Sequence, residues 1–225
     1  CEIRGIRWIR ILYCYPEEIY DELIETIRDE KKICHYLDIP IQHASDHILK
    51  RMGRRTSKQE LIDIVGKLRK EIPDIVLRTT LITGFPGETE EDHEELKEFV
   101  DEMEFDRLGV FTYSPEENTP AAEMADQVPE EVKEERRDEL MELQQEISYD
   151  RGQDRIGQEL LVMIEGKVAD ESAYIGRTYG DAPKVDGYIF VQTGELLMTG
   201  DFAKVRVTGA LEYDLIGVLS DEYTE

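Results

Sequence analysis

The stretch Ile75-Val76-Leu77-Arg78-Thr79-Thr80-Leu81-Ile82-Thr83-Gly84-Phe85-Pro86-Gly87-Glu88-Thr89 joins a β-branched apolar run to a glycine-rich turn. A strand with apolar residues on both faces is typical of a parallel sheet covered on both sides. Gly84 and Gly87 allow a sharp turn that a Cβ would obstruct, and Thr89 followed by acidic residues favours a helix start. The stretch therefore predicts the carboxyl edge of a βα unit, where α/β folds place ligands. The alternative is an ordinary tight turn without a ligand.

The same alternation of strands and helices extends to about residue 113. Apolar runs predict strands at residues 6–13, 36–42, 75–83 and 107–113. Amphipathic runs predict helices at residues 17–28, 46–52, 57–71 and 90–103. Strands separated by such helices indicate parallel βαβ units. Four strands are too few for a full (β/α)₈ barrel, so the fold class expected is α/β, the C-terminal part of a parallel, TIM-like barrel.

The pattern changes after a proline-punctuated loop and a long acidic helix from Glu130 to about Arg151. Short strands separated by glycine-bearing turns are predicted at residues 160–166, 173–177, 185–191, 202–207 and 214–219. Five such strands fit a small antiparallel OB-like β-barrel. The expected domains are therefore residues 1–151, which include the acidic closing helix, and residues 152–219, followed by an acidic tail at 220–225.

The net charge of −25 is unevenly distributed. Residues 1–85 hold 14 acidic and 15 basic residues, whereas residues 86–106 hold 11 acidic and one basic, and residues 116–150 hold 13 acidic and 3 basic. Acidic helix faces keep a protein dissolved, or they steer it toward a basic partner. They disfavour nucleic-acid binding, because phosphates require lysine and arginine.

The cysteines indicate the cellular compartment of the protein, and the first residues of the chain indicate whether it is part of a longer protein. Cys1, Cys14 and Cys34 match neither a paired metal motif nor a disulfide framework. We expect them to be buried or incidental free thiols of a protein in a reducing cytoplasm. No apolar run approaches the ~20 residues of a membrane span, and no signal peptide is visible, so no membrane is expected. The start at Cys1, without Met, suggests a piece of a longer protein.

Three blocks in order resemble the radical-SAM methylthiotransferases, and the resemblance covers nearly the whole chain. The blocks are residues 37–54, 80–89 and 105–119, and the barrel after residue 152 resembles a TRAM domain. Within that family, Gly176-Arg177-Thr178-Tyr179-Gly180-Asp181-Ala182-Pro183-Lys184-Val185-Asp186-Gly187 resembles the branch that modifies an aspartate of a small-subunit ribosomal protein. The acidic charge favours the same branch over those that modify tRNA adenosines, since ribosomal proteins are basic.

This resemblance implies an enzyme that uses S-adenosyl-L-methionine (SAM) and two 4Fe-4S clusters to transfer a methylthio group to the aspartate β-carbon. One SAM donates a methyl group to sulfur, and another is cleaved to a 5′-deoxyadenosyl radical that removes a hydrogen from that carbon. The family's CxxxCxxC cluster motif is absent from the 225 residues. We therefore expect the cluster cysteines upstream of Cys1, no cluster and no assignable catalytic residue in this chain, and no activity from the chain alone.

The resemblance places part of a SAM pocket on the opening stretch. The backbones of Ile82, Gly84 and Phe85 are expected to line the adenine. Glu88 is a candidate for contact with the adenine, and the alternative is a cap at the helix N-terminus.

Arg10, Arg78 and Gln42 are candidates for the carboxylate or ribose of SAM, or for the substrate carboxylate, because guanidinium groups match carboxylates. The alternative for each arginine is an ion pair inside the barrel. His43 follows a strand end, where a structural hydrogen bond is the main alternative to a site role. The basic cluster at residues 50–58 is interpreted as solvated surface, and contact with a phosphate is the alternative.

Other classes of function stay open. The first is a tRNA adenosine methylthiotransferase of the same family, and the second is a non-catalytic binding module for a basic protein. An aldolase or isomerase would need a lysine or paired carboxylates at strand ends, which the sequence does not show. We expect a monomer whose partner is a basic small-subunit ribosomal protein, bound through an acidic face of the TRAM-like barrel.

Overall fold

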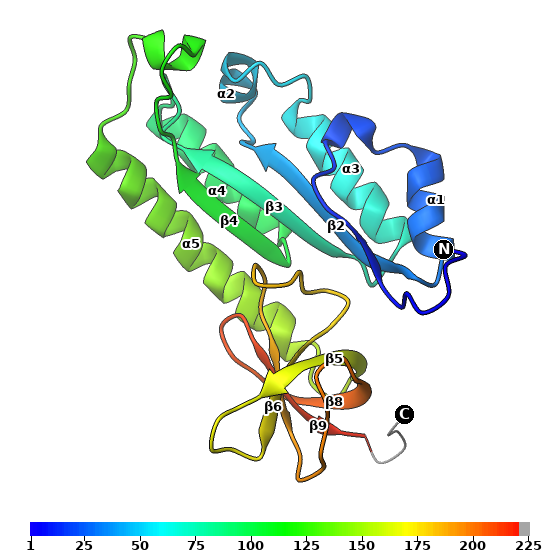
Figure 1. Cartoon of the computed structure of the whole chain (residues 1–225). Coiled ribbons are helices and arrows are strands. Elements are labelled where there is room, and N and C mark those ends of the chain that lie inside the picture. Colours follow the sequence, from blue (N-terminus) through cyan, green and yellow to red (C-terminus); the bar gives the residue numbers. More distant parts are fainter. Residues whose placement is uncertain (221–225) are drawn as a thin grey trace. The chain divides into compact units, whose positions relative to one another are not determined.

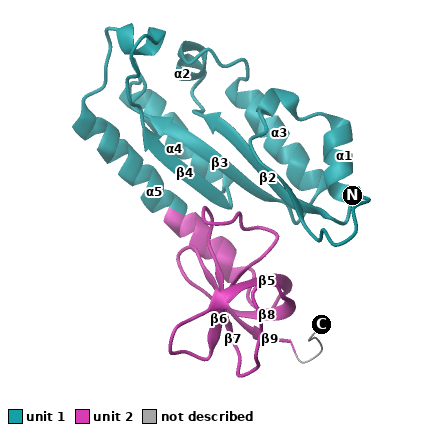
Figure 2. Ribbon diagram, in the orientation of Figure 1, with its two compact units in different colours: residues 1–144 teal, residues 145–225 magenta. Residues whose placement is uncertain are grey.

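A computed structural model describes residues 1–220, so the predicted acidic tail lies outside the described residues except for Ser220. Two compact units, Cys1–Gln144 and Gln145–Glu225, divide inside the long helix α5 (Figure 2). The predicted domain bounds at residues 151 and 152 stay a prediction. Over residues 1–220, no helix is both long and apolar enough to cross a membrane.

The first unit consists of a sheet and the helices that connect its strands (Figure 1). Its strands are β1 (Ile9–Ile11), β2 (Ile33–Gln42), β3 (Val76–Thr83) and β4 (Arg107–Thr112). Its helices are α1 (Asp21–Asp29), α2 (Asp46–Arg51), α3 (Lys58–Glu71) and α4 (Glu90–Met103), with short 3₁₀ helices at Pro16–Glu18 and Pro120–Glu123. Helix α5 (Glu130–Gln153) begins in this unit and continues into the second.

The strands lie in the order β1-β2-β3-β4, and all three neighbouring pairs are parallel. This confirms the parallel α/β sheet that the alternation predicts. Strand β2 passes through Pro40, and its register with β3 shifts between Ile39 and Gln42. The shift is explained by the proline, which supplies no N–H to the ladder. Strand β1 is shorter than predicted and is followed at Tyr13 by a left-handed backbone with φ of 64°, which ends the extended run.

The helix starts follow the capping residues closely. Ser57 and Thr89 cap α3 and α4, and in both cases the third helical residue returns a hydrogen bond to the cap, which is a capping box. The predicted helix at 17–28 is divided in two, because Tyr20 is extended between the 3₁₀ helix and α1.

The second unit is a closed barrel of β5 (Glu159–Lys167), β6 (Ala173–Arg177), β7 (Ile189–Gln192), β8 (Phe202–Ala210) and β9 (Leu215–Leu219). The strand order is β5-β6-β7-β9-β8, and β8 pairs back to β5. Four pairings are antiparallel and the β7–β9 pairing is parallel. Strand β7 begins later than the predicted residue 185, because Asp186 is held in a turn in which its carboxylate accepts the N–H of Ala182.

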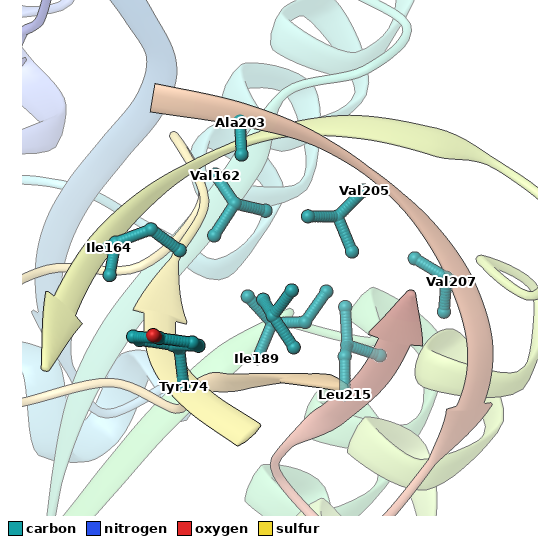
Figure 3. Packing of buried hydrophobic residues seen from close by; sticks show 9 residues of the cluster. Val162, Ile164, Tyr174, Ile189, Ala203, Val205, Val207 and Leu215 are labelled. Atoms are coloured by element: carbon teal, nitrogen blue, oxygen red, sulfur yellow. The ribbon is translucent and has the colours of Figure 1, made fainter. Parts of the chain in front are cut away.

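The barrel is filled by a tight cluster of aliphatic side chains and the ring of Tyr174, shown in Figure 3. Val162, Ile164, Ile189 and Val205 are fully buried there. Little space remains around the strands, since a Cβ added to Gly217 would lie 2.5 Å from Val205 Cγ1 and 2.8 Å from a backbone oxygen. The barrel core is therefore sensitive to added volume.

We expect Gly217→Ala to lower the free energy of unfolding of the barrel by about 1–3 kcal/mol, the usual effect of overpacking. Gly166→Ala is the matched control, because Gly166 lies on β5 and a Cβ there meets nothing within 4 Å. Urea denaturation of both variants provides the measurement. Equal stability of the two variants would contradict the packing described here.

Candidate functional site

A cavity of about 610 Å³ lies where β2, β3 and β4 end. Its lining comes from the strand ends and from the loops that follow them. The lining residues are Tyr13, Tyr15, Pro40, Gln42, Met52, Arg54, Thr80, Ile82, Phe85, Phe111, Thr112, Tyr113 and Ser114. This is the carboxyl edge of a parallel sheet, the position predicted for a ligand.

The two faces of β3 differ in burial, and the cavity lies on the less covered face. Leu77 and Leu81 are fully buried, whereas Thr80 and Ile82, which alternate with them, are half-buried and line the cavity. Ile82 pairs in register with Phe111 of β4, which is 60% exposed and also lines the cavity. The strand therefore uses one face for the core and the other for the cavity wall.

The glycine turn after β3 has the backbone that its sequence predicts. Gly84 and Gly87 have φ of 71° and 84°, the left-handed region that glycine tolerates best. A Cβ at Gly84 would also overlap the side chain of Lys133 on α5. The turn is therefore restricted to glycine at this position both by backbone conformation and by packing.

The carboxylate of Glu88 is fully buried beneath this turn and is engaged at both oxygens. Its Oε2 accepts the N–H groups of Gly84 at 2.7 Å and Phe85 at 3.3 Å, and its Oε1 accepts from Arg136 at 2.9 Å. His43 Nε2 lies 3.5 Å from Oε2, and the imidazole is also fully buried. Glu88 therefore holds the turn from inside the protein, and it does not line the cavity.

A second buried carboxylate, Asp92, joins the loop after β2 to the start of α4. It accepts hydrogen bonds from Ser45 Oγ at 2.5 Å and from the N–H and hydroxyl of Thr89 at 3.0 Å each, and His47 Nδ1 lies 3.0 Å away. Burial by itself raises the pKa of Asp92, but these hydrogen bonds outweigh burial and lower the pKa from 3.8 to about 2. The ionised carboxylate therefore stabilises the folded state.

This pKa gives a pH-dependent prediction. Because the folded pKa lies below the unfolded one, the contribution of Asp92 is complete above about pH 4 and is lost as the pH falls toward 2. We expect Asp92→Asn to be less stable than the parent chain at pH 6 and to lose less stability between pH 5 and pH 2.5. Asp101→Asn, on an exposed position of the same helix, is the control. Urea denaturation across this range measures the difference, and parallel pH profiles for parent and Asp92→Asn would refute it.

Phe85 and Tyr113 form an aromatic corner of the cavity. Their ring centroids are 5.2 Å apart in an edge-to-face arrangement, and Tyr113 N–H donates to Thr83 O at 2.8 Å. Among the described residues the Tyr113 hydroxyl has no hydrogen-bond partner, and it is enclosed by protein. The two aromatic rings are therefore what this corner offers a ligand in the cavity.

Three of the seven predicted cofactor-binding residues, Gln42, Ile82 and Phe85, line this cavity. Gly84 lies beside it in the turn. Arg78 instead donates to Asp38 Oδ1 at 2.8 Å on the same face of the sheet, and Arg10 stacks on the ring of Tyr36 at 4.4 Å from its centroid. Neither arginine belongs to the lining, and the ligand roles of all seven stay predictions.

The cation that does line the cavity is Arg54, which follows α2. Its guanidinium stacks on the ring of Tyr15 at 5.1 Å and donates to Pro40 O. In sequence it belongs to the basic cluster at 50–58 interpreted above as solvated surface. Its neighbour Arg51 likewise turns inward and donates to Pro86 O at 2.8 Å. Helix α2 separates Arg54 from the end of β2 in the sequence, so no local signal marks its place on the cavity wall.

These residues fit the nucleoside part of SAM better than they fit an iron–sulfur cluster. An aromatic and aliphatic wall, the amide of Gln42 and one guanidinium suit a base, a ribose and a carboxylate. Within the described residues, no three His, Cys, Asp or Glu side chains are grouped to hold a metal.

Comparison with known proteins agrees with both halves of this architecture. Residues 1–100 match the family model of the radical SAM superfamily, and residues 156–219 match that of the TRAM domain. A solved structure, coproporphyrinogen III oxidase (HemN) from Escherichia coli, superposes with a TM-score of 0.54 at 16% identity, covering 88% of this chain and 46% of that one. At this identity the likeness supports the fold alone.

Curated relatives are much more similar in sequence. The chain is 66% identical over 217 residues to ribosomal protein uS12 methylthiotransferase RimO of Lachnoclostridium phytofermentans, which covers 96% of this chain and 49% of the relative. It is 53% identical over 224 residues to the RimO of Clostridium botulinum strain Langeland, covering 100% of this chain and 50% of the relative. The chain thus spans about half the length of these relatives. The chain therefore combines a radical SAM domain with a TRAM domain and is similar along its whole length to the RimO methylthiotransferases.

Proposed function

We propose that the chain is part of a radical-SAM enzyme that transfers a methylthio group to the β-carbon of an aspartate in a small-subunit ribosomal protein. The relatives that match its full length are named for methylthio transfer to uS12. The observation in the structure that best supports this proposal is the cavity at the carboxyl edge of β2, β3 and β4, walled by Ile82, Phe85 and Tyr113.

The cavity is proposed to receive SAM, which when bound supplies the methyl group and the hydrogen-abstracting species of the reaction. Ile82, Phe85 and the ring of Tyr113 provide the apolar wall for the adenine. Gln42 lies where it can hold the ribose. Arg54 is the guanidinium available for the amino-acid carboxylate, in place of Arg10 and Arg78. Together these groups orient the ligand and exclude water from one side of it.

A carboxylate role for Arg54 predicts selective loss of affinity. S-Adenosylhomocysteine carries the amino-acid carboxylate, whereas 5′-methylthioadenosine lacks it. We expect Arg54→Gln to weaken S-adenosylhomocysteine binding by about tenfold or more, since hydrogen bonds to charged groups contribute about 1.5–3 kcal/mol, and to leave 5′-methylthioadenosine binding unchanged. Titration calorimetry of this chain measures both affinities.

Arg55→Gln is the matched control, because Arg55 is the next residue and is exposed. Phe85→Ala is expected to weaken both ligands, since it removes the shared adenine wall. Equal weakening of both ligands by Arg54→Gln would contradict the carboxylate role, and failure of the parent chain to bind either ligand would contradict the SAM pocket.

The proposed protein partner is a basic ribosomal protein, met by an acidic face of the barrel. Residues 152–219 hold 11 acidic and 6 basic residues, an unfavourable surface for tRNA phosphates. We further propose that the protein acts in the cytoplasm, as a monomer. Co-precipitation of this chain with purified uS12 and with tRNA at moderate salt separates the candidates: retention of uS12 alone supports the proposal, and retention of tRNA alone favours the tRNA alternative.

A further inference from the structure

Helix α5 begins with two buried cations that the sequence did not single out. The side chains of Lys133 and Arg136 are 5% and 8% exposed. Because a buried charge is costly unless it is paired, each must have partners that hold it in one position. Those partners belong to the cavity wall and to the turn beside it.

Lys133 joins the ends of β3 and β4. Its Nζ donates to the carbonyl of Tyr113 at 2.9 Å and to Glu130 at 3.0 Å, and it lies 5.5 Å from the centroid of the Tyr113 ring. Its own carbonyl accepts from Thr83 Oγ1 at 3.2 Å. Its aliphatic stem fills the space in which a Cβ of Gly84 would lie. A single residue therefore contacts the ends of both strands next to the aromatic corner.

Arg136 holds the turn through Glu88. Nη1 donates to Glu88 Oε1 at 2.9 Å and to the Glu88 carbonyl at 3.3 Å, and Nη2 donates to Glu90 at 3.1 Å. The other oxygen of Glu88 accepts the N–H groups of Gly84 and Phe85. The position of the Phe85 backbone is thus fixed by a chain of charge-assisted hydrogen bonds that starts on α5.

We propose that Lys133 and Arg136 are positioning residues that fix the Gly84–Phe85 turn and Tyr113, and thereby set the affinity of the cavity for a nucleoside ligand. Neither residue lines the cavity, so both act through others. The inference rests on the proposed SAM pocket for the identity of the ligand. The inference goes beyond that pocket, because the affinity for the ligand then depends on α5, a helix outside the βα units that form the cavity wall.

The variants that test this inference are Lys133→Met and Arg136→Met, which keep aliphatic volume and remove charge. Two controls lie on the same helix. Arg137→Met changes the next residue, whose pairing is with its neighbour Asp138. Gln144→Leu breaks the 2.8 Å hydrogen bond that the buried Gln144 amide donates to Phe105 O. Because Phe105 precedes β4, this bond lies at the amino end of that strand, whereas the cavity lies at its carboxyl end.

Three measurements are made on each variant: urea stability, the dissociation constant for S-adenosylhomocysteine, and hydrogen exchange of the Gly84 and Phe85 amides. We expect Lys133→Met and Arg136→Met to weaken binding about tenfold and to speed exchange at these two amides. Gln144→Leu is expected to lose stability with unchanged affinity. Arg136→Lys, which keeps a charge for Glu88, is expected to recover part of the affinity, and it replaces Arg136→Met as the test if that variant does not fold.

Affinity that follows stability alone, with Gln144→Leu as weak as the two test variants, would overturn the inference. Unchanged amide hydrogen exchange at Gly84 and Phe85 would also overturn it, if it is found both in Lys133→Met and in the Arg136 variant that folds, Arg136→Met or Arg136→Lys. If the parent chain does not bind S-adenosylhomocysteine, the proposed function fails, and the exchange data then decide the positioning role without a ligand. Failure of the proposed function is therefore distinguishable from failure of the positioning role.

Discussion

Glu88→Leu is expected to lower the free energy of unfolding of the first unit by about 3–5 kcal/mol, the usual result of removing one member of a buried ion pair. The substitution leaves the 8%-exposed guanidinium of Arg136 facing an apolar side chain. It also removes the acceptor for the N–H groups of Gly84 and Phe85, which are buried. Buried N–H groups without an acceptor are penalised, and so is a buried guanidinium whose remaining carboxylate partner is the exposed Glu90, so the effect is larger than that of one hydrogen bond.

The control for this prediction is Glu90→Gln. Glu90 pairs with the same guanidinium at 3.1 Å, but its side chain is 71% exposed. Exposed pairs contribute about 0–1 kcal/mol, so Glu90→Gln is expected to stay close to the parent chain. The fluorescence of Trp8, the single tryptophan, reports on the first unit during urea denaturation. A loss below about 1 kcal/mol in Glu88→Leu would show that the network contributes no more than a surface pair.

Gly84→Ala is expected to destabilise the first unit by about 2–5 kcal/mol, from a left-handed backbone that costs about 1–2 kcal/mol and an overpacking cost of about 1–3 kcal/mol. The backbone cost follows from a φ of 71°, and the packing cost follows from overlap of the new Cβ with the stem of Lys133. Because the overlap involves the Cβ and Cγ of Lys133 as well as its Cδ, a rotation of the side-chain end does not relieve it.

Gly53→Ala separates the two costs. Gly53 has nearly the same φ, 74°, but a Cβ there meets nothing within 4 Å, so only the backbone cost remains. In the double variant Gly84→Ala with Lys133→Ala, the packing cost should largely disappear, which a double-mutant cycle measures as a coupling energy. Equal losses in Gly84→Ala and Gly53→Ala, with no coupling to Lys133, would contradict the contact between the turn and α5.

The elements of the fold were largely predictable because their signals are local. The helix at 90–103 was predicted with the bounds that α4 has, since Thr89 and the apolar stripe fix its start and its buried face. The parallel sheet followed from the spacing of the apolar runs. Strand β7 was predicted to begin at residue 185 but begins at Ile189, because the Asp186 carboxylate accepts the N–H of Ala182 and the Asp214 carboxylate accepts the N–H of Tyr188. Such side chain–backbone bonds leave little trace in hydropathy.

The candidate site was predictable only where it coincides with strand ends. Ile82, Phe85 and Gln42, which the family resemblance singled out, lie at or just after the carboxyl ends of β3 and β2, and all three line the cavity. Arg54, Lys133 and Tyr113 were missed, because their roles depend on contacts between segments far apart in the chain, such as the hydrogen bond from Lys133 to Tyr113 O. An arginine in an ion pair, such as Arg78 with Asp38, looks the same in sequence as one that faces a ligand.

The most direct test of the central claim is a titration of the isotope-labelled chain with S-adenosylhomocysteine, followed by amide NMR. The SAM-pocket proposal predicts saturable shifts at the amides of Ile82, Gly84, Phe85 and Tyr113, and none at the amides of the barrel core such as Val205. Absence of saturable shifts at these four amides, or shifts confined to other parts of the chain, would contradict the claim that the cavity at the ends of β2, β3 and β4 receives the nucleoside.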